Sequence, residues 1–302
     1  MSLTFSIVTP SYNQGEFIER TIQSVLSQSI KPFEYFVFDG GSKDNTIELL
    51  KKYESQLCWV SEKDNGQTHA VNKGLKKATG DIIGWLNSDD IYYPGALESV
   101  QRFFEENPSV GVVYGRANHI DKEDGVIEAY PTEPWDIERF KSICFLSQPA
   151  VFFRRSIVEN YGLLDEKLNF CMDYEYWMRL ASKGASFAHI PLVLAGSRFY
   201  LETKTLNQRV SVHKEINDML KKTLGKTPDR WLCNYAHVLI ETKGVPPAYK
   251  SPLWALVLLA GAIICASLRW NYSLSPSLRA MLKGWIKPYS RKIFLKFKGS
   301  NG

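Results

Sequence analysis

Two adjacent carboxylates, Asp89 and Asp90, end an apolar run that reads WLNSDD over residues 85–90. Carboxylate oxygens are the ligands that hard divalent cations such as Mg²⁺ and Mn²⁺ prefer, and these ions in turn hold phosphate groups. The pair therefore suggests a metal site for a phosphate-bearing substrate. A solvated turn after a buried strand would contain the same residues, so the surrounding chain must decide between the two interpretations.

The chain before this pair alternates strands and helices. Apolar periodicity predicts strands over residues 3–9, 35–38, 58–60 and 81–86, and helices over residues 16–27, 45–53 and 68–78. This alternation predicts an α/β fold with a parallel sheet and helices on both faces, in which ligands collect beyond the carboxyl ends of the strands. A polar cluster follows each of the four strands, so we expect four distant loops to converge on one edge of the sheet.

The chain beyond Pro94 is less regular. We expect a helix to about residue 107, a strand over 110–114, a strand near Ile127, a helix over 136–144 and a buried run over 145–153. An amphipathic helix over 170–183 opens with the acids Asp173 and Glu175. Acids in a first helical turn are favoured by the helix dipole alone, so their position does not by itself indicate catalysis.

Taken in order, these motifs resemble those of the glycosyltransferase family 2 enzymes, which have the GT-A fold. The matching segments are residues 6–13, residues 39–42 with Asp44, residues 62–66 with 72–74, and residues 80–81 leading into 85–90. The resemblance covers residues 1–205. It implies a mostly parallel central sheet flanked by helices, with a helical, basic C-terminal extension. It also implies a metal-dependent inverting transferase that uses a nucleotide-sugar donor, with a UDP-sugar favoured.

The resemblance also implies roles for individual residues. In the family, Asn87-Ser88-Asp89 corresponds to a DxD motif with Asn in the first place; Asp89 is then the main ligand of Mn²⁺ or Mg²⁺, with Asp90 close by. Asp173 lies where the family has its general base, and Glu175 competes for that role. The residues expected to bind the donor are Pro10, Tyr12, Asn13, Asp39, Asp64, Gly66, Asn72, Asn87, Ser88 and Arg198. Relatives often have His where Tyr200 stands, and Gln148 is expected on the acceptor side.

The positive charge is concentrated at the C-terminus. Residues 250–302 contain nine Lys or Arg and no Asp or Glu, whereas the first 249 residues carry 28 basic against 32 acidic side chains. The tail also contains an uncharged run over 253–268, which is shorter than the ~20 residues of a membrane-spanning helix. Basic helices with apolar faces, as over 278–297, suit an anionic membrane surface. Nucleic acid would leave the uncharged run unexplained, so we expect no nucleic-acid partner; a helical hairpin packed on its own domain or on a second subunit is the alternative.

Three regions are therefore expected: a GT-A domain over 1–205, a helical connection over 206–249 and the basic, apolar region 250–302. The five cysteines are dispersed and predict neither a disulfide framework nor a zinc site. No secretory signal is recognisable, so we expect a cytoplasmic protein at the inner face of the cell membrane. Its acceptor would be a saccharide or lipid-linked, in surface polysaccharide or O-antigen biosynthesis.

Two other functions remain open. A non-catalytic membrane-associated scaffold would retain the same fold. A sugar-1-phosphate nucleotidyltransferase shares a similar sheet, but its Gly-rich loop with a following basic residue is missing between Val8 and Gly15. The spacings of a dinucleotide fold and of a phosphate loop are also absent around Gly40.

Overall fold

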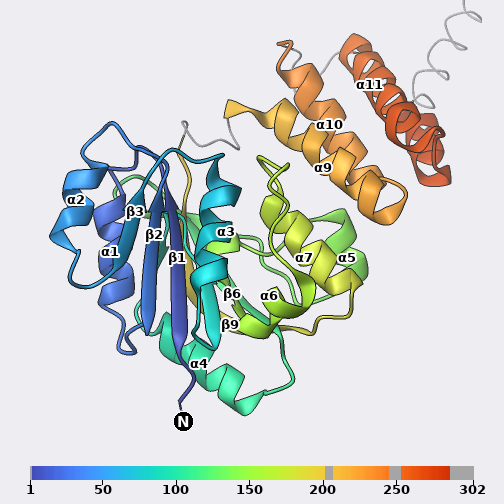
Figure 1. Cartoon of the computed structure of the whole chain (residues 1–302). Helices are drawn as coiled ribbons and strands as arrows, with labels where there is room; N and C mark the ends of the chain where they lie inside the picture. Colours follow the sequence, from blue (N-terminus) through green and yellow to red (C-terminus); the bar gives the residue numbers. More distant parts are fainter. Residues whose placement is uncertain (1, 201–206, 245–252, 286–302) are drawn as a thin grey trace, which may run out of the picture. The chain divides into compact units, whose positions relative to one another are not determined.

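The computed structural model describes residues 2–200, 207–244 and 253–285. The chain divides into two compact units (Figure 1). The first comprises Met1–Phe140 and Cys144–Asn207, and the second comprises Lys141–Ile143 and Gln208–Gly302.

The first unit is the predicted alternation of strands and helices, followed by a more irregular half. Its strands are β1 (Phe5–Ser11), β2 (Glu34–Asp39), β3 (Cys58–Ser61), β4 (Ile82–Trp85), β5 (Ile91–Tyr92), β6 (Val112–Ile120), β7 (Val126–Ala129), β8 (Val151–Arg154) and β9 (Phe187–Arg198). Its helices are α1 (Ile18–Leu26), α2 (Thr46–Lys52), α3 (Gln67–Lys77), α4 (Ala96–Glu106), α5 (Ile137–Ser142), α6 (Arg155–Tyr161) and α7 (Met172–Ser182), with a 3₁₀ turn at Gln148–Ala150.

The strands form one sheet in the order β3-β2-β1-β4-β8-β6-β9-β5, with β7 paired to β6. The pairs β1–β2, β1–β4, β2–β3 and β6–β9 are parallel, whereas β8, β5 and β7 pair antiparallel to their neighbours. The predicted α/β fold with a central sheet flanked by helices is therefore confirmed, and the sheet is mixed, because half of its strand pairings are antiparallel. Ser11 lies opposite Asp39, which lies opposite Ser61, so the ends of three parallel strands are level at one edge.

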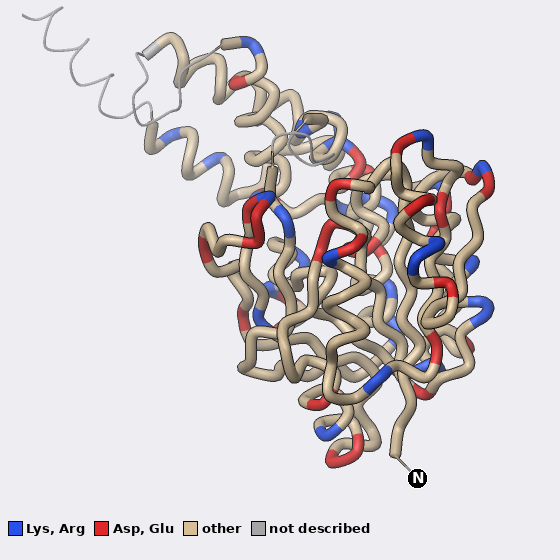
Figure 2. Tube along the Cα trace, turned by 90° about the vertical axis from the view of Figure 1, so that its left-hand side faces the viewer, with Lys and Arg blue, Asp and Glu red and all other residues tan. Residues whose placement is uncertain are grey.

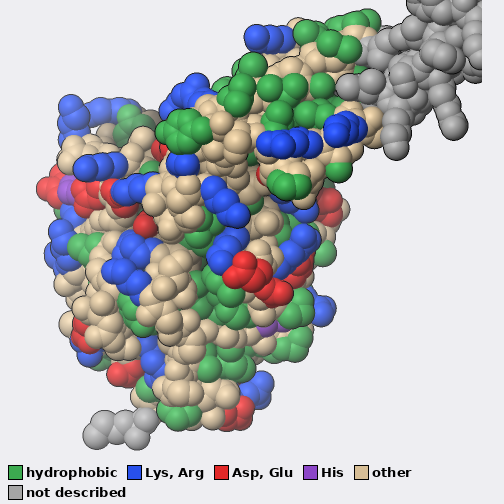
Figure 3. Space-filling view, turned by 90° about the vertical axis from the view of Figure 1, so that its right-hand side faces the viewer, with side chains coloured by type: hydrophobic (Ala, Val, Ile, Leu, Met, Phe, Trp, Pro, Cys, Tyr) green, Lys and Arg blue, Asp and Glu red, His purple; other side chains and the backbone are tan. Residues whose placement is uncertain are grey.

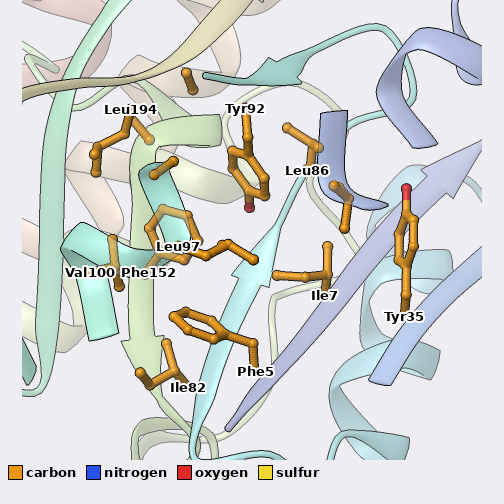
Figure 4. Packing of buried hydrophobic residues seen from close by; sticks show 14 of the residues in the cluster. Phe5, Ile7, Tyr35, Ile82, Leu86, Tyr92, Leu97, Val100, Phe152 and Leu194 are labelled. Atoms are coloured by element: carbon orange, nitrogen blue, oxygen red, sulfur yellow. The ribbon is translucent and has the colours of Figure 1, made fainter. Parts of the chain in front are cut away.

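Side chains of a strand alternate between the two faces of the sheet. Both faces are therefore apolar here, and helices cover both. On one face, Phe5 and Ile7 belong to the main core together with residues of α1, α2 and α4. Figure 4 shows them near Leu97 and Val100 of α4. On the other face, Val8 packs with Phe38 and with α3. α3 lies very close to β1, since a Cβ at Gly74 would stand 2.3 Å from Val8 Cγ1.

The second unit is helical. α9 (Arg209–Leu224), α10 (Asp229–Glu241) and α11 (Leu253–Asn271) are followed by helical backbone over 276–285. Its apolar core combines residues of α10 and α11 with Leu278: Leu232, Ala236, Ile240, Leu259, Ile263, Ala266 and Trp270. The uncharged run of the sequence thus forms α11, and one side of that helix packs on protein.

Residues 254–271 of α11 have a mean hydropathy of 1.5 and are 33% buried; among the described residues they form the one stretch long and apolar enough to cross a bilayer. Length and composition of one such helix are weak evidence for a membrane span. The basic residues at position 250 and within 287–298 lie outside the described residues.

Candidate active site

The loops that follow β1, β2 and β3 meet at the carboxyl edge of the sheet, where Asp and Glu residues are frequent (Figure 2). The Asn13 side chain accepts a hydrogen bond from the Lys43 backbone N–H (2.8 Å), and the Asn13 N–H donates to Ser42 Oγ (2.7 Å). Gly40 lies against Asp64, because a Cβ at Gly40 would stand 3.1 Å from its Oδ1. The predicted convergence of the loops is therefore present, and Asn13 joins the first loop to the second.

Asp39 is completely buried and organises two of these loops. Its Oδ2 accepts hydrogen bonds from the backbone N–H groups of Gly41 (3.0 Å) and Ser42 (2.9 Å) and from Ser61 Oγ (2.6 Å). The Ser42 hydroxyl donates to its other oxygen. The carboxylate that we expected to bind a base or ribose is thus already engaged by four donors of its own neighbourhood.

Asn87 makes four side-chain hydrogen bonds, one of them to the acidic pair. Its Oδ1 accepts from Gln67 Nε2 (2.8 Å) and Trp85 Nε1 (3.0 Å), and its Nδ2 donates to Asp90 Oδ2 (3.2 Å) and Gln148 Oε1 (2.8 Å). Both N–H donors and both oxygen lone pairs of the amide are thus used. Asn87 therefore fixes the acidic loop, and the expectation that its amide reaches a ligand is not supported.

The two acids differ in environment. Asp90 is buried and accepts hydrogen bonds from Asn87 and, at 2.8 Å, from the Arg198 backbone N–H. Burial raises the pKa of Asp90 well above its ordinary value, and the charge of Asp89 raises it further. Asp89 is half-buried, and its Oδ2 accepts a hydrogen bond from Tyr200 Oη (3.1 Å), whose ring packs on Phe17. Asp89 is thus the more accessible carboxylate.

Tyr200 was expected only as a substitute for a His of the relatives, and its contact with Asp89 could not be read from the sequence. Within residues 2–200, 207–244 and 253–285, no group of three or more His, Cys, Asp or Glu is placed to hold a metal ion. A cation at Asp89 would accordingly depend on oxygen atoms of a substrate and on water, as Mg²⁺ commonly does.

Arg198 does not face the site. Its side chain is fully buried, and its guanidinium donates to the backbone carbonyls of Asp89 (2.7 Å), Asp121 (2.6 Å) and Lys122 (3.0 Å) and to the Asp124 carboxylate. These bonds tie the end of β9 to the acidic loop and to the β6–β7 turn, and the contact of Arg198 with the donor diphosphate stays a prediction.

Asn72 also has a structural task. It is buried, its Nδ2 donates to the Leu164 carbonyl (3.1 Å) and to Glu166 Oε1 (2.9 Å), and its Oδ1 accepts from the Leu164 N–H (3.1 Å). These bonds hold the segment after α6 against α3. The expected donor contact of Asn72 stays a prediction.

Asp173 and Glu175, the two acids in the first turn of α7 that the sequence could not rank, have different environments. Glu175 is paired with Arg179 through two hydrogen bonds of 2.8 and 3.1 Å. Burial raises the pKa of Asp173 to about 6. Asp173 is near Tyr130 and Cys144, since its charge contributes to raising the pKa of both. Asp173 is therefore the acid with the properties of a base near neutral pH.

The remaining predicted residues lie on the loops at the edge. Tyr12 is 59% exposed at the end of β1, as a ring available for stacking would be, whereas Pro10 is buried within β1. Gly66 begins α3 with a φ of 106° and donates to Asp64 Oδ1 (2.8 Å). Ser88 is buried, and its carbonyl accepts from the Thr21 hydroxyl (2.9 Å).

A family model and related proteins both point to glycosyltransferases. A family model described as Glycosyl transferase family 2 matches residues 6–162. An uncharacterized glycosyltransferase of Rickettsia typhi is 29% identical over 233 residues, which are 72% of this chain and 71% of the relative. Chondroitin synthase of Escherichia coli is 27% identical over 72% of this chain, but the match covers only 32% of that enzyme.

Solved structures show the same fold. S. aureus TarS in complex with UDP-GlcNAc superposes with a TM-score of 0.60 at 17% identity, over 89% of this chain and 82% of that one. The mannosyltransferase PcManGT from Pyrobaculum calidifontis, in complex with GDP-Man and Mn²⁺, superposes with a TM-score of 0.58 at 19% identity, over 98% and 83% of the two chains.

Proposed function

This chain belongs to glycosyltransferase family 2, and on that basis we propose that it transfers a sugar from a nucleotide-sugar donor to a saccharide or lipid-linked acceptor with inversion at the anomeric carbon. A UDP-sugar is the favoured donor, in line with the UDP-GlcNAc complex of TarS; the GDP-Man complex of PcManGT makes a GDP-sugar the donor to compare with it. The observation that carries the proposal is the difference in burial within the acidic pair: Asp90 is buried and bonded to Asn87 and to the Arg198 N–H, whereas Asp89 is only partly buried.

We assign the cation to Asp89. Mn²⁺ or Mg²⁺, when bound there, would offset the charge of the diphosphate leaving group. The chain's own contribution is to hold that carboxylate in place: Arg198 binds the Asp89 carbonyl, and Thr21 binds the carbonyls of Ser88 (2.9 Å) and Asp90 (2.8 Å). Tyr200 must give up its hydrogen bond to Asp89 for the carboxylate to face a cation with both oxygens.

We assign the general base to Asp173. An acceptor hydroxyl is a poor nucleophile until its proton is removed as attack proceeds, and a carboxylate with a pKa of about 6 is both ionised at neutral pH and basic enough to take it. Glu175 is less suited, because Arg179 compensates its charge. Asp39, Asn13 and Asn87 position the loops, and Tyr12 and Asp64 are the residues that we propose to contact the base and ribose.

The wider setting is also a proposal. We place the reaction in surface polysaccharide or O-antigen biosynthesis at the inner face of the cell membrane. Its support is the concentration of basic residues after position 250, without any acid, next to the apolar helix α11. This charge would attract the protein to an anionic lipid surface.

Calorimetric titration with UDP-glucose, UDP-GlcNAc and GDP-mannose, with and without Mn²⁺, tests the donor assignment. We expect Mn²⁺ to strengthen the binding of one of them, Asp89→Ala to remove that gain, and Glu54→Ala, a change to an exposed acid after α2, to leave it intact. Asp173→Asn should bind the donor normally but release nucleoside diphosphate more slowly. Donor binding that Mn²⁺ never improves would favour the scaffold, and full turnover by Asp173→Asn would remove the base assignment.

A further inference from the structure

The outward side of α11 carries an exposed apolar stripe. Six residues on it are spaced alternately four and three apart, which keeps them on one side of a helix. These residues, here called the outer stripe, are Trp254, Leu258, Gly261, Cys265, Leu268 and Tyr272, and all six are exposed. Trp254, Leu258 and Leu268 are each about half exposed (52%, 49% and 51%). So extended a row of exposed apolar side chains indicates a surface that meets an apolar partner.

The opposite side of α11 is committed to the helical unit. Leu259, Ile263 and Trp270 belong to the core shared with α10, and Trp270 Nε1 donates to Asp218 Oδ1 of α9 (2.8 Å). Asn271 exchanges two hydrogen bonds of 2.8 Å with the backbone of Thr227. For α11 to cross a bilayer, these contacts would have to break, or the charged helices α9 and α10 would have to enter the hydrocarbon, which is costly. The geometry therefore favours a helix that lies in the plane of a membrane.

The charges beside the stripe favour an anionic surface over a protein partner. Lys221 Nζ lies 4.8 Å from the ring centre of Tyr272, and the Arg269 guanidinium lies 4.9 Å from that of Trp270. Arg279 and Lys283 on the next helical segment are exposed. In Figure 3, hydrophobic and Lys or Arg side chains share one face of these C-terminal helices. Trp254 and Tyr272 mark the two ends of the stripe, and such aromatic rings prefer the headgroup level of a bilayer.

We propose that the outer stripe of α11 is the membrane-binding face of this protein. The helix inserts its outward side between anionic lipids, parallel to the surface, while its inner side stays packed on α10. The proposal rests on the proposed function only for its membrane setting. It adds which residues enter the lipid. It also excludes a membrane span by α11. Monotopic amphipathic helices typically insert their apolar face about 5–10 Å into the membrane, and we expect the outer stripe to reach a similar depth.

Two native cysteines provide the first test. Cys265 is exposed in the middle of the outer stripe, and Cys58 is exposed on β3 of the first unit. The full chain is labelled with a polar maleimide alone, with phosphatidylcholine vesicles, and with vesicles containing phosphatidylglycerol. We expect phosphatidylglycerol vesicles to slow labelling at Cys265 and to leave Cys58 unchanged. Equal labelling rates at Cys265 in all three samples would overturn the proposal. It would also be overturned if Cys265 were protected from labelling without vesicles and light scattering showed a dimer.

A second measurement separates an in-plane helix from a spanning one. Cys265 lies three residues from the centre of α11, so in a spanning helix it would be about 5 Å from the bilayer midplane. A bimane attached to Cys265 in a Cys58→Ser chain should be quenched more by nitroxides near the headgroups than by nitroxides deep in the acyl chains. The reverse order would show a membrane span.

A matched pair of double variants tests the stripe itself. Leu258→Gln with Leu268→Gln should weaken sedimentation with phosphatidylglycerol vesicles about tenfold, because two half-exposed leucines lose their burial in lipid. Phe33→Gln with Val126→Gln alters residues of similar exposure in the first unit and should have no effect. Donor binding is measured for every variant, so a chain that binds vesicles but no donor would refute the proposed function alone. If the chain binds its donor and the two leucine substitutions leave vesicle binding unchanged, the membrane face alone would be refuted.

Discussion

Replacing Asn87 with Asp would restore the acid that the DxD motif usually has in its first place, and we expect it to weaken the protein. The Asn87 amide donates to Gln148 Oε1 and to Asp90 Oδ2, and both acceptors belong to buried residues. A carboxylate has no N–H, so both donations are lost and a second negative charge lies beside Asp90. The two hydrogen bonds that Asn87 accepts from Gln67 and Trp85 would persist.

The size of the effect follows from these contacts. Leaving a buried acceptor unsatisfied costs about 1–3 kcal/mol, so two of them, with some relaxation, should lower the free energy of unfolding by about 3 kcal/mol. Protonation of one carboxyl of the new pair would restore a donor. The loss should therefore be larger at pH 8 than at pH 5, because burial and the charge of Asp89 raise the pKa of Asp90 and so favour protonation of the pair as the pH falls.

Urea unfolding of wild type, Asn87→Asp and the control Asn65→Asp at both pH values measures this effect. Asn65 is exposed in the loop before α3, and its substitution should change stability by no more than about 0.5 kcal/mol. If Asn87→Asp were as stable as wild type at pH 8 and bound Mn²⁺ more tightly, Asn87 would be a weakened metal ligand rather than the organiser of the loop.

Three further perturbations test other parts of the structure. Because burial raises the pKa of Asp173 to about 6, turnover should increase with pH through about 6 and then level off. An acid with a raised folded-state pKa costs stability once it ionises, so Asp173→Asn should melt like wild type below pH 4 and be about 1–3 kcal/mol more stable above pH 7. Arg198→Lys should lower the free energy of urea unfolding by about 2–4 kcal/mol, because a lysine cannot reproduce the several hydrogen bonds of the buried guanidinium. The control Arg102→Lys changes an exposed residue and should leave the free energy of unfolding unchanged. Gly74→Ala should cost about 1–3 kcal/mol because its Cβ overlaps β1, whereas Gly261→Ala on α11, with open space around it, should be neutral or stabilising in thermal melts.

The sequence predicted the fold well where side-chain periodicity decides it. The first four strands and three helices follow from apolar spacing, and the strand ends meet because parallel strands share one edge. The irregular half was predicted less completely: β6 continues to Ile120, and no strand was predicted where β9 runs from Phe187 to Arg198. Pairing of β6 with β9 brings together residues some 75 positions apart, and no local pattern specifies such a partner.

The site was predicted by residue type, and type alone could not separate residues that face a ligand from residues that hold the loops. Asp39, Asn72, Asn87 and Arg198 are polar residues at strand or helix ends, as ligand-binding residues would be, yet all four spend their hydrogen bonds on protein. The different environments of Asp173 and Glu175 likewise needed the structure, because Arg179 pairs with Glu175 across one helical turn. Tyr200 reaches Asp89 from 111 positions away, a contact that only the fold specifies.

The bond between the Arg198 N–H and Asp90 has a consequence for synthesis on the ribosome. The two residues are 108 positions apart, and at about 5–20 residues per second the ribosome needs roughly 5–20 s to travel from one to the other. During that interval the acidic loop of the nascent chain lacks both the backbone donor and the guanidinium that fix it. The segment 6–162 that matches the family model therefore emerges before Arg198 can hold the acidic loop, and a chain stopped there would have the motif without its support.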